Sequence, residues 1–184
     1  MKRYIMTGAP GAGKTSILRL LEQRGYAVVE EAATDVIAAR QQTPGRTELD
    51  DPLFISKITE MQVRRQQEPV SSGAVAQVFD RSPVCTLALA HWVDHPVPAA
   101  LSQEIERIAG GQVYERQVFF VRPLGFVEPT AARRISYTDS LAFERVHETE
   151  YLALGFEIVD VPAGPVAERA ALVDEYLRRL TGTG

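Results

Sequence analysis

Cysteine is almost absent from this chain of 184 residues, which contains only Cys85. A single cysteine excludes an intrachain disulfide and fits a reducing cytosol, so we expect a cytoplasmic protein. We interpret Cys85, which lies between Val84 and Thr86, as a buried small side chain rather than as a nucleophile. No stretch approaches roughly 18 consecutive apolar residues, so the sequence predicts no membrane span.

An excess of positive charge is also absent. Lys and Arg together number 20 against 24 Asp and Glu, which gives a net charge of −4. Without a basic excess or a block of like charge, the sequence does not indicate a nucleic-acid partner. The three histidines, His91, His95 and His147, lack the spacing of metal ligands, and we interpret all three as structural.

The sequence contains no internal repeat, no low-complexity segment and no linker long enough to separate two domains. A length of 184 residues is enough to bury a sizeable core. The hydrophobic fraction of 45% and the charged fraction of 24% are ordinary for a globular protein. We therefore predict a single domain over residues 1–184.

Glycine is concentrated at residues 8–15, where GAPGAGKT matches the G-x-x-x-x-G-K-[ST] pattern of a phosphate-binding P-loop. An apolar run precedes the motif and helical spacing follows it, which is the strand–loop–helix context that it needs. Backbone N–H groups would cradle the phosphates, Lys14 would reach the terminal phosphates, and Thr15 would ligate magnesium. The alternative is a glycine-rich turn that binds nothing. The predicted nucleotide-binding residues are Gly8, Ala9, Pro10, Gly11, Ala12, Gly13, Lys14, Thr15 and Ser16.

Apolar runs alternate with stretches of helical spacing along the whole chain, which predicts an α/β fold with a parallel sheet. A continuous apolar run such as residues 26–29 is typical of a strand that is buried on both faces. Ligands of such sheets bind beyond the carboxyl ends of the strands, where we expect the P-loop, Glu31, Asp80 and Arg81 to meet. The expected strands are 3–7, 26–29, 74–80, 117–121 and 156–161. The expected helices are 13–24, 32–42, 51–69 with Asp51 as its cap, 83–91, 99–109, 131–135, 138–154 and one from 166 onward.

Two residues follow directly from the third apolar strand. Asp80 is placed to hold magnesium, and the alternative is a cap for the next helix. Arg81 could contact a phosphate or an acidic substrate, and the alternative is an ordinary surface ion pair. Both assignments depend on the strand end facing the P-loop.

Three further residues are candidates for catalysis. Glu31 could accept a proton from an attacking hydroxyl or anchor a substrate, or it could simply favour a helix N-terminus. Glu30 should leave the opposite face of the strand. Arg133 and Arg134 could close over the transferring phosphoryl group, or they could belong to a solvated turn. Arg64 and Arg65 lie on the helix beyond the second strand, where a substrate-binding lobe could form, and we favour the alternative, a solvated helix face.

Four short motifs accompany the P-loop: VVEEAA at 28–33, FDR at 79–81, ARR at 132–134 and LGFEIVDVP at 154–162. Together they resemble the small bacterial P-loop proteins grouped as AAA family ATPases of the kinase-like type. Those proteins are related to the nicotinamide riboside kinase domain and, more distantly, to deoxynucleoside and nucleoside monophosphate kinases. The chain lacks the additional helical domain and the separate arginine finger of ring-forming AAA machines, which favours the kinase interpretation.

The resemblance implies a five-stranded parallel sheet in the order 2-3-1-4-5, with helices on both faces and with ATP and Mg²⁺ at the P-loop. It implies that Glu31 is the base or substrate anchor, that Arg133 or Arg134 is the lid arginine, and that adenine lies near Pro162, Ala163 and Gly164. We therefore expect a kinase that transfers the terminal phosphoryl group of ATP to a small-molecule acceptor held between Glu31 and Arg81. The sequence leaves open whether the protein is an oligomer. The alternatives are an ATP-hydrolysing switch for a protein partner and a non-catalytic nucleotide-binding module.

Overall fold

Five parallel strands form a single sheet in the order β2-β3-β1-β4-β5. This computed structural model describes residues 1–39, 47, 49, 51–70, 73–111, 113–125 and 136–182. The order and the parallel directions confirm the predicted sheet. The strands are β1 (Lys2–Thr7), β2 (Ala27–Val29), β3 (Ala76–Asp80), β4 (Gln117–Val121) and β5 (Glu157–Val161).

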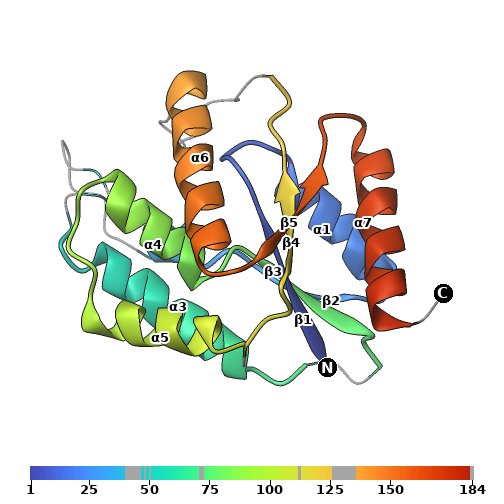
Figure 1. Ribbon diagram of the computed structural model, residues 1–184, viewed down its shortest axis with the longest axis horizontal. Helices are drawn as coiled ribbons and strands as arrows, with labels where there is room; N and C mark the ends of the chain where they lie inside the picture. Colours follow the sequence, from blue (N-terminus) through green and yellow to red (C-terminus); the bar gives the residue numbers. More distant parts are fainter. Residues whose placement is uncertain are drawn as a thin grey trace.

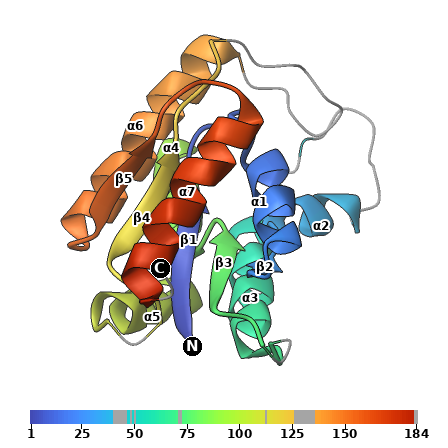
Figure 2. The same cartoon turned by 90° about the vertical axis from the view of Figure 1, so that its right-hand side faces the viewer.

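Helices cover both faces of the sheet (Figure 1). Helices α1 and α7 pack together on one face, which Figure 2 brings to the front, while α4, α5 and α6 lie on the other face and α3 packs against α4 and α5. The helices are α1 (Lys14–Gln23), α2 (Ala32–Ala38), α3 (Phe54–Gln67), α4 (Pro83–Trp92), α5 (Ala99–Ala109), α6 (Tyr137–Ala153) and α7 (Val166–Thr181). None of the described helices has the length and apolar character needed to cross a membrane.

The central strand β1 is buried because its alternating side chains enter two different cores. Tyr4 and Met6 belong to the core beneath α1 and α7, whereas Ile5 belongs to the core beneath α4, α5 and α6. All three side chains are fully buried. Burying each large apolar side chain stabilises the fold by about 1.5–3 kcal/mol, so these three side chains hold the strand that leads into the P-loop in place.

The edge strand β2 differs from its prediction. Its three residues are only half-buried, so the expectation of burial on both faces is wrong. The strand pairs with β3 alone, and its other edge has no strand beside it in the described part of the chain. An apolar run alone does not distinguish an edge strand from a central one.

Two predicted helix boundaries also differ from the structure. Helix α2 ends at Ala38, before residue 42, and residues 40–46 lie outside the described residues. Helix α3 has Leu53 rather than Asp51 at its cap position. Asp51 instead accepts hydrogen bonds from the main-chain N–H of Leu53 at 2.9 Å and from Lys57 Nζ at 2.8 Å, so it stabilises the turn just before the helix.

Candidate active site

The loop between β1 and α1 requires glycine for two different reasons. A Cβ atom on Gly8, whose φ is 132°, would lie 2.2 Å from the main-chain oxygen of Val121. Gly13 precedes α1 with φ 89°, a left-handed conformation that disfavours side chains. The loop therefore turns back tightly at its start and enters the helix at its end, which is the course expected of a P-loop.

Helix α1 begins with exposed donors. No side chain caps its N-terminus, its first turn contains no acidic residue, and Thr15 and Ser16 are exposed. The first N–H groups of a helix have no intrahelical acceptor, and the helix dipole adds partial positive charge there. Together with the positive-φ glycines, this end of α1 can bind an anion such as a phosphate.

Lys14 lies over the loop that it follows. Its Nζ donates hydrogen bonds to the main-chain oxygens of Gly8 at 3.2 Å and Ala9 at 3.1 Å, and the residue is 7% exposed. Burial and, to a smaller extent, the neighbouring Arg81 together lower the pKa of Lys14 to about 8, while Asp80 partly opposes both effects. Both hydrogen bonds of the ammonium group go to main-chain oxygens, and no carboxylate of the described residues lies within hydrogen-bonding distance of it. The ammonium group is therefore available for an anionic ligand.

Asp80 ends β3 beside this lysine. Its Oδ1 is buried and has no hydrogen-bond partner among the described residues. Burial raises the pKa of Asp80 to about 6, against the opposing effect of Lys14. The alternative role as a helix cap falls to Ser82, whose Oγ accepts a hydrogen bond from the main-chain N–H of Val84 at 3.2 Å.

The oxygens of Asp80 and Thr15 fit a magnesium ion. Mg²⁺ usually binds one or two protein oxygens and completes its shell with water and substrate phosphates. The orphaned Oδ1 of Asp80 is such an oxygen. The described ranges contain no cluster of three or more histidine, cysteine or acidic side chains that could hold a metal by themselves.

Arg81 is held in an unusual backbone conformation next to Glu31. Its φ is 71°, and its main-chain N–H donates to the oxygen of Met6 at 2.9 Å. Its Nε lies 2.6 Å from Glu31 Oε1, but the N–H does not point at the oxygen, so the contact is an ion pair rather than a linear hydrogen bond. The Arg81 side chain is only 11% exposed, so this is not an ordinary surface pair.

Glu31 occupies the cap position of α2, yet its side chain does not cap the helix. Its Oε2 accepts a hydrogen bond from Thr34 Oγ1 at 3.0 Å. Burial alone would raise the pKa of Glu31, but Arg81 and Lys14 together outweigh burial and lower it. The carboxylate is therefore ionised at neutral pH and can accept a hydrogen bond.

Glu30 and Arg65 have structural roles at the same strand end. The Glu30 side chain is exposed, as its predicted orientation requires. Arg65 donates to the main-chain oxygen of Glu30 at 2.6 Å and also pairs with Asp35. The Arg65 side chain is only 13% exposed, so its prediction as part of a solvated face is wrong, whereas Arg64 is exposed as predicted.

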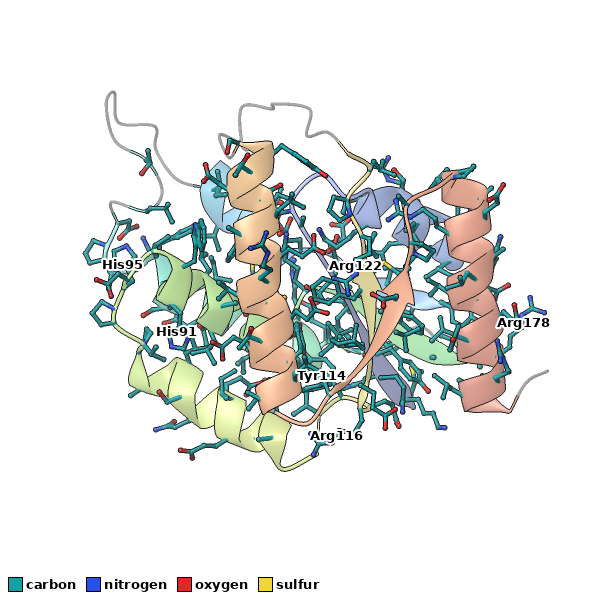
Figure 3. The ribbon with its side chains drawn as sticks, turned by 45° about the horizontal axis from the view of Figure 1, so that its top comes forward. His91, His95, Tyr114, Arg116, Arg122 and Arg178 are labelled. Carbon is teal, nitrogen blue, oxygen red and sulfur yellow. The ribbon has the colours of Figure 1, made fainter. Side chains whose placement is uncertain are left out.

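Two arginines that the sequence analysis did not select connect the P-loop to the segment after β4 and to helix α6. Arg169 donates to the main-chain oxygens of Ala12 at 2.7 Å and Arg122 at 2.8 Å. The Arg122 side chain, which lies between α6 and α7 in Figure 3, pairs with Glu144, Glu148 and Asp160. The only sequence signal was the position of Arg169 within the apolar stripe of the last helix.

Pro162, Ala163 and Gly164 are exposed between β5 and α7. They lie at the carboxyl end of the sheet, and α7 begins just after them and contacts the P-loop through Arg169. Arg133 and Arg134 lie outside the described residues. The structure therefore brings together Lys14, Glu31, Asp80 and Arg81, while the predicted lid arginines remain predictions.

Two cavities lie near β2. One of about 10 Å³, about the size of one water molecule, lies between the ends of β2 and β3 and helix α3, with Asp80 and Arg81 in its wall. The other, of about 490 Å³, lies along β2 and the last turns of α1 and α3. No P-loop residue lines the larger cavity, so the volume of a cavity does not by itself identify the candidate active site.

The loop, the buried lysine and the acidic strand end define a P-loop nucleotide-binding domain. The chain belongs to the AAA domain family, which matches residues 3–169. None of the curated proteins matches the chain in sequence.

Solved structures with the same fold include kinases and nucleotide-bound proteins. The NadR protein in complex with NAD and AMP-PNP has a TM-score of 0.63 and 16% sequence identity, and the match covers 98% of this chain and 49% of the NadR chain. The NadR protein in complex with NR has a TM-score of 0.69 and 16% sequence identity, and the match covers 98% of this chain and 52% of the NadR chain. The chain thus spans about half the length of NadR. The deoxyadenosine kinase from M. mycoides with dCMP and dCDP bound has a TM-score of 0.56 at 15% identity, covering 97% and 99%. At these identities the likeness establishes the fold alone.

Proposed function

We propose that residues 1–184 form one domain that transfers the terminal phosphoryl group of ATP to the hydroxyl or phosphate group of a small metabolite. The observation that carries this proposal is the pairing of Glu31 with Arg81 at 2.6 Å beside the P-loop lysine. A domain that only hydrolysed ATP would need no second charged pair of this kind. The kinase fold of a deoxyadenosine kinase supports the same proposal.

On the nucleotide side, the P-loop amides and Lys14 would bind the phosphates, while Thr15 and Asp80 would hold Mg²⁺. When bound, the ion neutralises charge that develops on the phosphate oxygens. Asp80 would contribute its orphaned Oδ1 without breaking an existing hydrogen bond. We place adenine at Pro162, Ala163 and Gly164, because that loop joins β5 to the helix that contacts Ala12.

On the acceptor side, Glu31 would accept a hydrogen bond from the acceptor hydroxyl and Arg81 would bind a neighbouring oxygen. Because the pKa of Glu31 is lowered, the carboxylate is ionised and can accept the hydroxyl proton late, as the new O–P bond forms and the bond to ADP breaks. A loose phosphoryl-transfer transition state requires little proton abstraction before transfer. The adjoining cavity of about 10 Å³ must widen to admit the acceptor. Arg133 or Arg134 would then neutralise the transferring group.

A screen of ATP consumption against a metabolite panel tests the proposal, with Glu31→Gln and Glu30→Gln as a matched pair. Glu31→Gln keeps the shape of the side chain but removes its charge, so acceptor-stimulated turnover should fall roughly 10²–10⁴-fold while ATP affinity stays within a few-fold. Glu30→Gln should change little, because that side chain is exposed. Equal turnover of wild type and Glu31→Gln with the true acceptor would remove Glu31 from the mechanism.

The same screen separates the other interpretations. Stimulation by a protein and by no metabolite would favour an ATP-hydrolysing switch. Tight binding of ATP without any turnover would indicate a nucleotide-binding module that lacks catalysis.

A further inference from the structure

Helix α6 contacts the turn between β3 and α4 through two side chains one helical turn apart. His147 Nε2 lies 3.2 Å from Arg81 Nη1, and the Tyr151 hydroxyl lies 2.7 Å from Ser82 Oγ. Residues four apart lie on the same face of a helix, so α6 presents both side chains to two consecutive residues of the turn. Both His147 and Tyr151 are fully buried.

The hydrogen bonds of His147 define which ring nitrogen carries the proton. Nδ1 lies 2.9 Å from the main-chain oxygen of Phe143. A carbonyl oxygen can only accept, so Nδ1 carries the hydrogen and Nε2 carries a lone pair. Nε2 therefore accepts a hydrogen bond from Arg81 Nη1, which can only donate.

This tautomer requires a neutral imidazole, and the lowered pKa of His147 keeps the ring neutral. Burial and, to a smaller extent, the positive charge of Arg81 together lower the pKa of His147 to about 3. The imidazole is neutral at physiological pH, so it accepts from the guanidinium without repelling it. The ring of Phe143, 4.1 Å from the His147 ring between centroids, leaves the imidazole little room to rotate away.

Arg81 needs supporting contacts because its main chain has an unfavourable conformation. A non-glycine residue at φ 71° costs of order 1 kcal/mol or more, and it persists only when surrounding contacts hold it. Glu31 contacts the guanidinium at Nε and His147 contacts it at Nη1. Two contacts on different nitrogens define the plane of a guanidinium, whereas one contact leaves it free to rotate.

We propose that His147 is a positioning residue, whose Nε2 orients the guanidinium of Arg81 for the acceptor. This inference rests on the proposed acceptor role of Arg81. His147 touches neither the P-loop nor Glu31 through any hydrogen bond among the described residues, so its effect should reach the acceptor and not the nucleotide.

Two substitutions separate the contact with Arg81 from the contact with Phe143. Gln can place its amide oxygen where Nε2 of His147 lies, so His147→Gln keeps an acceptor for Arg81. Asn reaches only as far as Nδ1, so His147→Asn keeps the donor to Phe143 and loses the acceptor for Arg81. Tyr151→Phe is the control for a general weakening of α6, because it removes the contacts with Ser82 and Cys85 and keeps the hydrogen bond between His147 and Arg81.

We expect His147→Asn to raise the KM for the acceptor by roughly tenfold or more, the usual worth of one hydrogen bond to a charged group, with ATP affinity within about twofold of wild type. His147→Gln should recover most of that loss, and Tyr151→Phe should leave the acceptor KM near wild type. Equal acceptor KM values for the Asn and Gln variants, or an equal rise for Tyr151→Phe, would overturn the proposal.

A nuclear magnetic resonance measurement does not depend on activity. In ¹⁵N-labelled wild type at about pH 7, His147 should show a protonated Nδ1 and an unprotonated Nε2. The Arg81 Nε–H signal, assigned by its loss in Arg81→Lys, should be resolved in wild type and His147→Gln and should broaden in His147→Asn. A different tautomer, or an unchanged Arg81 signal in His147→Asn, would refute the positioning role. The expected spectra without transfer to any acceptor would instead refute the proposed function.

Discussion

Arg169 donates a hydrogen bond of 2.7 Å to the main-chain oxygen of Ala12, although the two residues are 157 positions apart in the chain. Arg169 is 4% exposed, and the other terminal nitrogen of its guanidinium donates to the main-chain oxygen of Arg122 at 2.8 Å. One side chain of α7 thus links the P-loop to the segment that follows β4. The conformation of the phosphate-binding loop therefore depends on the last helix.

Removing this link should weaken both the fold and nucleotide binding. Arg169→Leu leaves two main-chain oxygens without a donor, and each unsatisfied buried group costs about 1–3 kcal/mol. We expect urea denaturation to show that loss and calorimetry to show weaker binding of Mg-ATP. Arg178→Leu, on the exposed side of the same helix, is the matched control and should leave ATP affinity unchanged. Equal ATP affinity in both variants would contradict the supporting role of Arg169.

ATP binding at about pH 8 should take up about half a proton per protein molecule. Free Lys14 has a pKa of about 8, so about half of the molecules are uncharged there, and the approach of phosphate oxygens raises that pKa. Calorimetry in two buffers with different ionisation enthalpies measures the uptake directly. Lys14→Ala should keep the fold and lose most of the affinity. Binding heats that do not depend on the buffer at this pH would argue against contact between Lys14 and the phosphates.

Asp80→Asn should stabilise the protein at pH 7 while it slows turnover. The pKa of Asp80 is raised to about 6, so its ionised form is unfavourable in the folded protein, and a neutral amide removes up to about 3 kcal/mol of that penalty. A metal ligand matters most in the transition state, so turnover should fall far more than nucleotide affinity. A lower melting temperature together with normal turnover would mean that Asp80 has only a structural role.

His147 should make the protein less stable as the pH falls. Its pKa is lowered from 6.5 to about 3 in the folded state, so the unfolded chain binds the extra proton first. The stability that depends on this group is complete above pH 6.5 and is lost between 6.5 and about 3. Between pH 7 and 5, wild type should lose about 2 kcal/mol more than His147→Gln in urea denaturation. Parallel losses in the two proteins would show that His147 protonates freely when folded.

Gly8→Ala should destabilise the fold much more than Gly25→Ala. Both glycines have positive φ, 132° and 91°, but a Cβ atom meets a main-chain oxygen at 2.2 Å in the first and nothing within 4 Å in the second. We expect a loss of about 3 kcal/mol or more for Gly8→Ala and about 1–2 kcal/mol for Gly25→Ala. Thermal or urea denaturation compares them, and similar losses would show that the loop can move away from Val121.

Local sequence signals were enough to predict the order of the sheet and a P-loop nucleotide-binding domain. The helix at Ala99–Ala109 and the strand at Gln117–Val121 have the predicted bounds, because breakers flank a strong periodic or apolar pattern in each case. The carboxyl-end rule brought Glu31 and Asp80 together correctly, since it depends only on strand direction.

The contacts between distant side chains could not be predicted in the same way. His147 and Arg81 are separated by 66 residues, and a single sequence contains no signal that these two side chains are in contact. The available hint was the spacing of Phe143, His147 and Tyr151 at every fourth position, which placed the histidine on a buried helix face. Likewise, Cys85 was predicted to be buried, but not its contacts at 3.1 Å with Thr7 Oγ1 and 3.2 Å with the Tyr151 hydroxyl.

The position of β2 has a consequence for how this site can change over evolutionary time. The strand that leads into the P-loop has a neighbour on each side, whereas the strand that leads into Glu31 has three residues and one neighbour. Main-chain amides of β1 should therefore exchange with solvent far more slowly than those of β2. A lineage can alter the weaker strand at little cost in stability, while the P-loop that follows β1 is inherited unchanged.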